Sequence, residues 1–282
     1  MNTVSGSALD ADWLGVCRRA VTGLEQMLAA APSTDERAAE TGSRGSGGDR
    51  TLVIDESAES LVFAQLDELS AAGHRFRVIS EERGEVDYGD GGVRVIIDPI
   101  DGSLNAKRGI PHHALSIAVA DGDTMADVVF AYVYDFGPAE EWRATRGEGA
   151  WCNDVPLDRE AGERRGRDGR LEVIGIESAD PRWVAASIDR LVDSAYRLRA
   201  LGTIASSLCQ VAAARFDAML TLRNGRGFDA AAGQLIVREG GGYVSFPRFA
   251  DPLGAPLDTS ASTPVIAARS LETLRELETV PT

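Results

Sequence analysis

Lysine is almost absent from this sequence. Its 29 basic residues include a single lysine, Lys107, and 44 acidic residues outnumber them, which gives a formal net charge of −15. A surface of that sign repels the phosphate backbone of nucleic acids and offers no basic face to a membrane. We therefore expect neither a nucleic acid nor a membrane among its partners. The composition fits a protein kept soluble at high salt, and it equally fits the codon bias of a GC-rich genome.

Cysteine and histidine are also scarce. The three cysteines, Cys17, Cys152 and Cys209, are scattered and show no CxxC spacing, which argues against both a disulfide framework and a zinc site. Three histidines are too few for a histidine-based metal site. The sequence has no apolar run of about 18 residues, and its N-terminus lacks the basic and apolar regions of a signal peptide. We expect a soluble, cytoplasmic protein.

The 282 residues, 44% of them hydrophobic, can bury a sizeable core as two packed halves. In the first half, residues 1–160, apolar spacing predicts a helix over 10–30 and another from Asp55 onward, with a Gly- and Ser-rich loop at 31–50 between them. Strands are predicted in the same half at 74–80, 93–97, 114–120, 127–134 and 141–145. This half is therefore interpreted as helices on a mostly antiparallel sheet.

The second half, residues 161–282, follows a polar segment at 156–170 that interrupts the pattern. Helices and strands alternate in it, which is typical of an α/β unit. The expected strands are 171–176, 197–200, 217–222, 242–246 and 264–268, and the expected helices are 181–195, 203–214, 229–239 and 270–278. Together the halves predict an α+β / α/β fold that forms one catalytic unit.

The segment Asp98-Pro99-Ile100-Asp101-Gly102-Ser103 combines features of a cation site and an anion site. Two carboxylates three residues apart at the end of an apolar strand would repel each other unless a cation lay between them. Gly102 and Ser103 add backbone amides and a hydroxyl where a turn or helix begins, which is a favourable place for an anion. The combination indicates a metal-dependent enzyme that acts on phosphates.

Two further acidic residues fall at the ends of predicted elements. Glu81 follows the strand at 74–80, and Asp229 begins the helix at 229–239. Hard divalent cations prefer carboxylate oxygens, and Mg²⁺ often shares its ligands with substrate phosphates. Such ions polarise a phosphoryl group and lower the pKa of a bound water. The residues alone support a metal at Asp98 and Asp101, and they support the inclusion of Asp229 only weakly.

Five segments, in order, resemble the inositol monophosphatase family, and most closely its archaeal-type branch with inositol monophosphatase and fructose-1,6-bisphosphatase activities. The longest is DPIDGSLNAKRGIPHHALSIAVADG (98–122). The other four are TLVIDESAE (51–59), ISEE (79–82), RGEGAWCND (146–154) and FDAAAGQLIVREGGGYV (228–244). Together the five segments span nearly the whole chain. Two positions depart mildly from the family pattern, since Phe228 replaces its usual Trp and Ser80 its usual Gly.

The resemblance implies a Mg²⁺ site of two or three ions, with Mn²⁺ as a possible substitute. The implied ligands are the carboxylates of Glu81, Asp98, Asp101 and Asp229 and the backbone carbonyl of Ile100. It also implies the fold, an αβαβα layered sandwich of the inositol monophosphatase / fructose-1,6-bisphosphatase type, and a homodimer.

The resemblance assigns catalysis to Asp55, Glu81 and Ser103. Asp55 would orient the Ser103 hydroxyl, which would relay the proton of an attacking, metal-activated water, with Glu81 beside it. The phosphate would be held by Asp101, Gly102 and Ser103.

The remaining substrate contacts implied by the resemblance come from the second half. They are Arg199, Gly202, Thr203 and Ile204, with Arg223 at the position that meets a second anionic group. The implied reaction is hydrolysis of a small phosphate monoester, inositol-1-phosphate or fructose-1,6-bisphosphate. The alternatives are a 3′-phosphoadenosine 5′-phosphate phosphatase and a non-catalytic metal-binding relative.

The same residues also have plainer interpretations. Asp55, Ser103 and Asp229 could each be only a helix N-cap, because Asp and Ser side chains accept from free amides at helix starts. Arg199 and Arg223 could be ordinary surface arginines. The pair His112-His113 is expected to be structural or to lie at the substrate rim, because hard cations prefer oxygen ligands.

Overall fold

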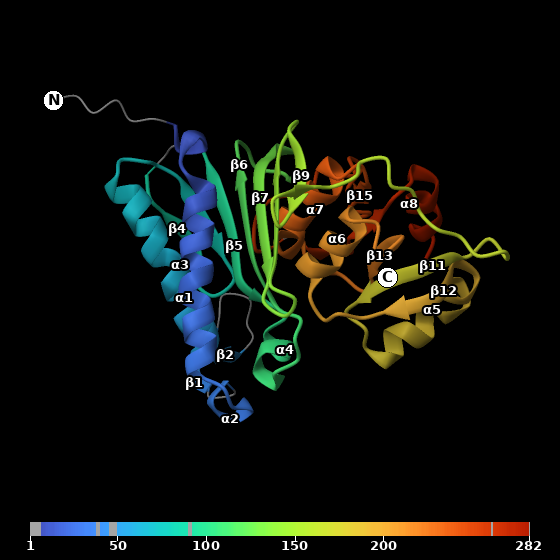
Figure 1. Cartoon of the computed structure of the whole chain (residues 1–282), viewed down its shortest axis with the longest axis horizontal. Helices are drawn as coiled ribbons and strands as arrows, with labels where there is room; N and C mark the ends of the chain where they lie inside the picture. Colours follow the sequence, from blue (N-terminus) through green and yellow to red (C-terminus); the bar gives the residue numbers. More distant parts are fainter. Residues whose placement is uncertain (1–6, 38–39, 45–49, 90–91, 261, 282) are drawn as a thin grey trace.

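The computed structural model describes residues 7–37, 40–44, 50–89, 92–260 and 262–281. Two β-sheets are stacked with helices between them and on both outer faces (Figure 1). This confirms the predicted layered α+β sandwich, with the layers in the order αβαβα. No helix in these ranges is long and apolar enough to cross a membrane, and the three cysteines are free thiols.

The first sheet has eight strands in the order β10-β9-β8-β7-β6-β5-β3-β4. All neighbours are antiparallel except the β3–β5 pair. The strands are β3 (Arg77–Ser80), β4 (Gly84–Asp87), β5 (Arg94–Asp101), β6 (Ala114–Ala120), β7 (Val128–Asp135), β8 (Glu140–Thr145), β9 (Gly149–Cys152) and β10 (Val155–Pro156).

Helices α1 (Trp13–Ala30) and α3 (Val53–Ala71) cover the outer face of this sheet (Figure 1). Asp12 caps α1, because its Oδ1 accepts from the Gly15 amide at 2.9 Å. Strand β6 is buried on both faces and alternates in size: Leu115, Ile117 and Val119 pack toward α1 and α3, and smaller alanines face the other way. The small side chains leave room for the middle helical layer.

The second sheet has five strands in the order β12-β11-β13-β17-β15, parallel at β12-β11-β13 and antiparallel beyond. They are β11 (Leu171–Glu177), β12 (Ala195–Arg199), β13 (Ala218–Thr221), β15 (Tyr243–Ser245) and β17 (Ile266–Ala268). Helices α5 (Pro181–Ser194) and α8 (Leu271–Leu277) pack on its outer face.

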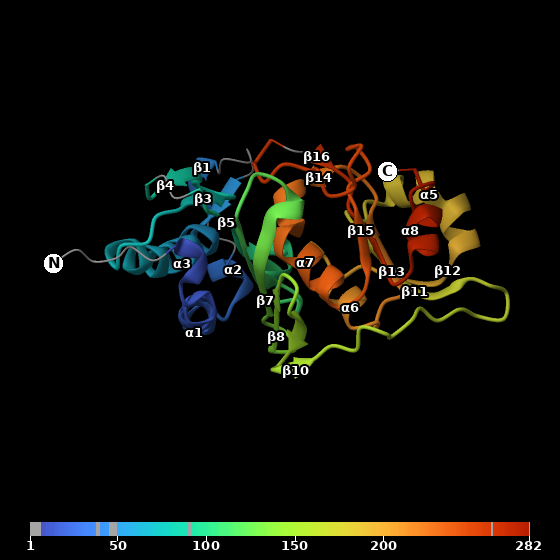
Figure 2. The same cartoon turned by 90° about the horizontal axis from the view of Figure 1, so that it is seen from above.

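The middle layer consists of α6 (Ile204–Ala212) and α7 (Ala231–Glu239), which lie between the two sheets (Figure 2). Although both helices belong to the second half, they share one buried apolar core with strands of the first sheet. Burial of that surface stabilises the contact between the halves, at about 25 cal/mol per Å² of apolar area. The two halves therefore pack as one unit.

Some elements differ from the sequence-based expectation. The loop expected at 31–50 contains α2 (Thr34–Arg37), and β1 (Glu40–Arg44) pairs there with β2 (Arg50–Leu52); residues 38–39 and 45–49 of it lie outside the described ranges. The structure also adds short elements that carry too few residues for a clear periodicity. These are β4, β9, β10, the pair β14 (Gly225–Arg226) and β16 (Ser262–Thr263), and the 3₁₀ helices Ala8–Asp10, Met125–Asp127 and Gly227–Ala230.

Candidate active site

The DPIDGS segment begins inside a strand. Strand β5 continues to Asp101, whereas the sequence predicted its end at residue 97. Asp98 lies opposite Ser116 of β6 and Asp101 opposite Ala114, so β5 has one extra residue between these pairs. Pro99 has no amide to donate to the ladder, and a bulge of this kind re-aims the side chains around it. The extra residue explains how the charge of Asp101, three residues away, comes to affect the pKa of Asp98.

A cavity of about 120 Å³ lies beside this bulge. Its lining brings together residues from α3, from the end of β3, from β5 and from the start of α4 (Ser103–Arg108), which are distant in sequence. The lining residues are Asp55, Glu81, Glu82, Asp98, Pro99, Ile100 and Ser103. Five of these were named from the sequence as metal ligands or catalytic residues.

The carboxylates around the cavity are strongly perturbed. Burial raises the pKa of Asp98 well above its usual range, and the neighbouring charges of Glu81 and Asp101 raise it further. Burial also raises the pKa of Asp101 to about 6, against the opposing effect of hydrogen bonds from Thr203 and Ala205. Burial raises the pKa of Asp229 in the same way, although the nearby Arg226 opposes the shift. Several buried negative charges therefore share this part of the molecule.

Arg226 lies among these carboxylates, and the sequence analysis did not single it out. Its guanidinium donates to Glu81, and its Nε lies 3.8 Å from Asp229 Oδ2. Burial lowers the pKa of Arg226, but the charges of Asp229 and Glu81 outweigh this effect and raise it overall. Arg226 thus supplies positive charge to an otherwise acidic cluster.

The donors at this cluster suit a hard divalent cation. Glu81, Asp98, Asp101 and Asp229 offer only oxygen ligands, which Mg²⁺ prefers. Asp229 Oδ1 is buried without a hydrogen-bond partner, as expected of an atom that serves as a ligand. Within the described residues no three acidic, histidine or cysteine side chains already converge closely enough to hold an ion. The set fits Mg²⁺ by its chemistry, provided that Arg226 releases Glu81.

A second cavity has a volume of about 440 Å³. Gly202, Thr203 and Ile204, which the sequence predicted to contact substrate, line it together with Asp101. Thr203 caps α6 and donates its hydroxyl to Asp101 Oδ2, and the Ala205 amide donates to the same oxygen at 2.6 Å. One side chain from the first half is thereby bound to the first turn of α6 in the second half.

Two glycines allow the turns on either side of Asp101 to approach closely. Gly102 and Gly202 have left-handed φ angles of 89° and 80°. A Cβ on Gly102 would lie 2.9 Å from the Gly202 carbonyl oxygen, and one on Gly202 would lie 2.7 Å from Asn105 Nδ2. The two backbone turns therefore meet with no space for a side chain between them.

The two predicted substrate arginines lie elsewhere. Arg199 is exposed and donates to the Leu198 carbonyl at 2.9 Å. The Arg223 guanidinium stacks on Trp183, 4.7 Å from its ring centroid. Neither lines the 440 Å³ cavity. The structure does not bring them to the phosphate turn in the way it brings Gly202, Thr203 and Ile204.

The alternative interpretation of three residues as helix N-caps is wrong. Asp55 lies in the first turn of α3, which begins two residues earlier at Val53. Ser103 is the first residue of α4, and the cap is Gly102. Asp229 lies within the 3₁₀ helix Gly227–Ala230. The structure therefore places none of the three at an N-cap position.

Comparison with known proteins places the chain among phosphatases. A family model described as the inositol monophosphatase family matches residues 12–279. A fructose-1,6-bisphosphatase/inositol-1-monophosphatase of Methanothermobacter thermautotrophicus is 30% identical over 271 residues, which cover 92% of this chain and 93% of that protein. The Nus factor SuhB of Escherichia coli K12 is 34% identical over 212 residues, 74% and 75% of the two chains.

A solved structure shares the fold. It is a Pyrococcus horikoshii protein described as similar to inositol-1 monophosphatase, and it superimposes with a TM-score of 0.78 at 24% identity. The match covers 96% of this chain and 99% of that chain.

Proposed function

The chain belongs to the inositol monophosphatase family, and from this premise we propose that it hydrolyses small phosphate monoesters with Mg²⁺ as its cofactor. Its class is that of the phosphoric monoester hydrolases. The observation that carries the proposal is the 120 Å³ cavity in which Asp55, Glu81, Asp98 and Ser103 meet. These residues come from different elements, so their meeting is a property of the whole fold.

In this proposal each residue has a defined task. Glu81, Asp98, Asp101, Asp229 and the carbonyl of Ile100 hold the metal. Bound Mg²⁺ supplies the positive charge that polarises the phosphoryl group and acidifies water. Gly102 and Ser103 would hold the phosphate together with Asp101. The Ser103 hydroxyl would take the proton of the attacking water as it passes its own proton to Asp55, which orients the hydroxyl. Water attacks directly, so no covalent enzyme intermediate forms.

The 440 Å³ cavity favours a neutral polyol as the organic part of the substrate. Its lining includes the acidic side chains Asp101 and Glu177, and among the described residues it contains no lysine or arginine. A second phosphate would therefore meet no cation inside it, which favours inositol-1-phosphate over fructose-1,6-bisphosphate. The same reasoning disfavours 3′-phosphoadenosine 5′-phosphate as the substrate, because it also carries two phosphates.

The test is phosphate release by the purified protein with Mg²⁺. We expect turnover of inositol-1-phosphate, slower turnover of fructose-1,6-bisphosphate, and a loss of at least about 10²-fold in the Asp98→Asn variant. Asp123→Asn is the matched control, because Asp123 pairs with Arg94 at the surface and lies outside the cavity. If wild-type protein binds Mg²⁺ in calorimetry but releases no phosphate from any of the three esters, the non-catalytic alternative is correct.

A further inference from the structure

The turn between β12 and α6, residues 201–203, is held by side chains from three separate elements. Asp101 of β5 accepts from Thr203 and from the Ala205 amide. Glu177, at the end of β11, binds the backbone amides of the turn. Asn105 of α4 donates to the Leu201 carbonyl of the turn. Only Asp101 was identified from the sequence.

Glu177 uses both of its carboxylate oxygens on this turn. Its Oε1 accepts from the Leu201 amide at 3.0 Å and from the Ser207 hydroxyl at 2.6 Å, and its Oε2 accepts from the Gly202 amide at 3.0 Å. The residue is only 3% exposed. A buried carboxylate is costly unless hydrogen bonds stabilise it, and here all three donors belong to the turn or to the helix that follows it.

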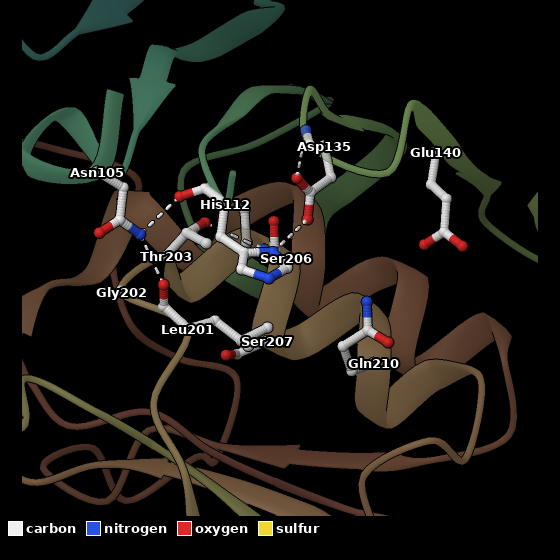
Figure 3. Close-up of polar contacts among 12 residues, drawn as sticks. Asn105, His112, Asp135, Glu140, Leu201, Gly202, Thr203, Ser206, Ser207 and Gln210 are labelled. Carbon is white, nitrogen blue, oxygen red and sulfur yellow. Dashed lines mark hydrogen bonds and ion pairs between the residues drawn. The ribbon is translucent and has the colours of Figure 1, made fainter. Parts of the chain in front are cut away.

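Asn105 joins the turn to the segment that follows the phosphate turn. Its Nδ2 donates to the Leu201 carbonyl and to the His112 carbonyl, both at 2.6 Å (Figure 3). Asn105 lies two residues after Ser103, in the same short helix. Asn105 and Glu177 therefore hold Leu201 from opposite sides, through its carbonyl and its amide.

We propose that Glu177 and Asn105 are positioning residues that set the distance between the turn at 201–203, which contacts the organic part of the substrate, and the phosphate turn at 101–103. The inference rests on the proposed function. Gly202, Thr203 and Ile204 line the 440 Å³ cavity, whereas Ser103 lines the 120 Å³ cavity. Displacement of the turn at 201–203 would weaken contact with the organic part more than it disturbs the phosphate chemistry, which the turn reaches through the hydrogen bonds that Thr203 and Ala205 donate to Asp101. A misplacement of about 1 Å can cost roughly 10²-fold in rate.

The experiment compares two substrates in Glu177→Gln and Asn105→Ala. One is the inositol or sugar phosphate that the wild type hydrolyses fastest, and the other is 4-nitrophenyl phosphate, which has no hydroxyl groups for the turn to contact. In Glu177→Gln an amide N–H₂ replaces one acceptor and faces a backbone donor. We expect kcat/KM for the polyol phosphate to fall about tenfold or more, mainly through KM, and kcat/KM for 4-nitrophenyl phosphate to change less than about twofold.

Glu239→Gln is the matched control. Glu239 is also a buried glutamate whose two oxygens accept from glycine amides, those of Gly147 and Gly149 at 2.9 and 3.0 Å, but it lies at the opposite end of α7 from Asp229. We expect it to lower thermal stability without changing the ratio of the two kcat/KM values. If Glu177→Gln lowers both kcat/KM values equally, as Glu239→Gln would, the role of Glu177 is structural and the proposal is wrong.

Amide hydrogen exchange tests the same inference without turnover. In folded Glu177→Gln we expect faster exchange at Leu201 and Gly202 and unchanged exchange in β6. Unchanged protection at Leu201 and Gly202 would overturn the inference. If the wild type hydrolyses neither ester, the proposed function fails, and the exchange data still decide whether Glu177 holds the turn.

Discussion

In the proposed function the Ser103 hydroxyl has two tasks in the 120 Å³ cavity, which are to hold the phosphate and to relay a proton. Ser103 lines it with Asp55, and neither residue is at the N-cap position of its helix. We expect Ser103→Ala to lower kcat by about 10²–10⁴-fold, the range typical of a lost acid–base group. Mg²⁺ affinity, measured by calorimetry, should change little because the hydroxyl is not among the proposed ligands.

Ser260→Ala is the matched control for this prediction, because Ser260 is exposed and does not line the 120 Å³ cavity. Unchanged turnover in Ser103→Ala would show that another group relays the proton.

Arg226 pairs with carboxylates that the proposed function assigns to the metal. Because its guanidinium donates to Glu81 and lies near Asp229, an ion bound as proposed would have to displace it. We expect Arg226→Gln to raise the Mg²⁺ affinity of the metal-free protein about tenfold, which corresponds to about 1.4 kcal/mol, and to lower its melting temperature in EDTA. Titration calorimetry and thermal unfolding measure the two effects.

Arg215→Gln serves as the comparison, because Arg215 pairs with Glu140 at 2.8 Å away from both cavities. Weaker Mg²⁺ binding in Arg226→Gln would mean that the arginine organises the ligands and does not oppose the ion.

The raised carboxylate pKa values predict how the metal-free protein responds to pH. Asp101 titrates at about 6 in the folded protein and at 3.8 as an ordinary side chain, so the folded state binds more protons between these values. Its contribution to stability is complete below about pH 4 and is lost as the pH rises through 6, and it is worth about 3 kcal/mol. The melting temperature in EDTA should therefore fall from pH 5 to pH 7. A rise over that interval would contradict the assignment, and Asp101→Asn should flatten the slope.

At the scale of elements, the two glycine turns approach each other closely. Gly202 has a φ of 80°, and a Cβ there would lie 2.7 Å from Asn105 Nδ2. We expect Gly202→Ala to lower the free energy of unfolding by about 1–3 kcal/mol and to impair turnover through movement of the turn. Gly162→Ala is the control, because a Cβ on Gly162 meets nothing within 4 Å. Denaturant unfolding compares the two, and equal stability would show that the turn adapts.

The longer helices and strands, and the residues that belong to sequence motifs, could be predicted from the sequence. Helices α1, α5 and α8 and strands β6, β7 and β11 lie close to their expected bounds, because each carries a clear apolar period or a turn at its end. Glu81, Asp98 and Ser103 were identified because their motifs are specific, and the fold brings them to one cavity.

Residues that act on the backbone could not be predicted in this way. Glu177 and Asn105 bind amides and carbonyls of a distant turn, and such contacts leave no spacing pattern in the sequence. Arg226 lies outside the five segments that match the family, so no motif pointed to it. The position of a proline inside β5 was also missed, because the bulge that accommodates Pro99 depends on its pairing with β6.

At the scale of the whole molecule, the net charge of −15 implies self-repulsion in the folded state. Salt screens this repulsion, since the Debye length falls to about 3 Å at 1 M. We expect the melting temperature at pH 7.5 to rise by about 3 °C or more between 0.05 and 1 M KCl, roughly 1 kcal/mol. The same titration near pH 4.7, the isoelectric point, should show little effect. An equal response at both pH values would indicate a general salt effect.

The packing of the middle layer bears on whether an unbroken chain is needed to hold the two halves together. Helices α6 and α7 come from the second half yet share a buried core with the first sheet, and the segment between the halves is exposed over 166–169. Packing, and not the peptide link, therefore keeps the DPIDGS turn against the turn at 201–203. Fragments divided at this exposed segment should reassociate into an active, nicked enzyme.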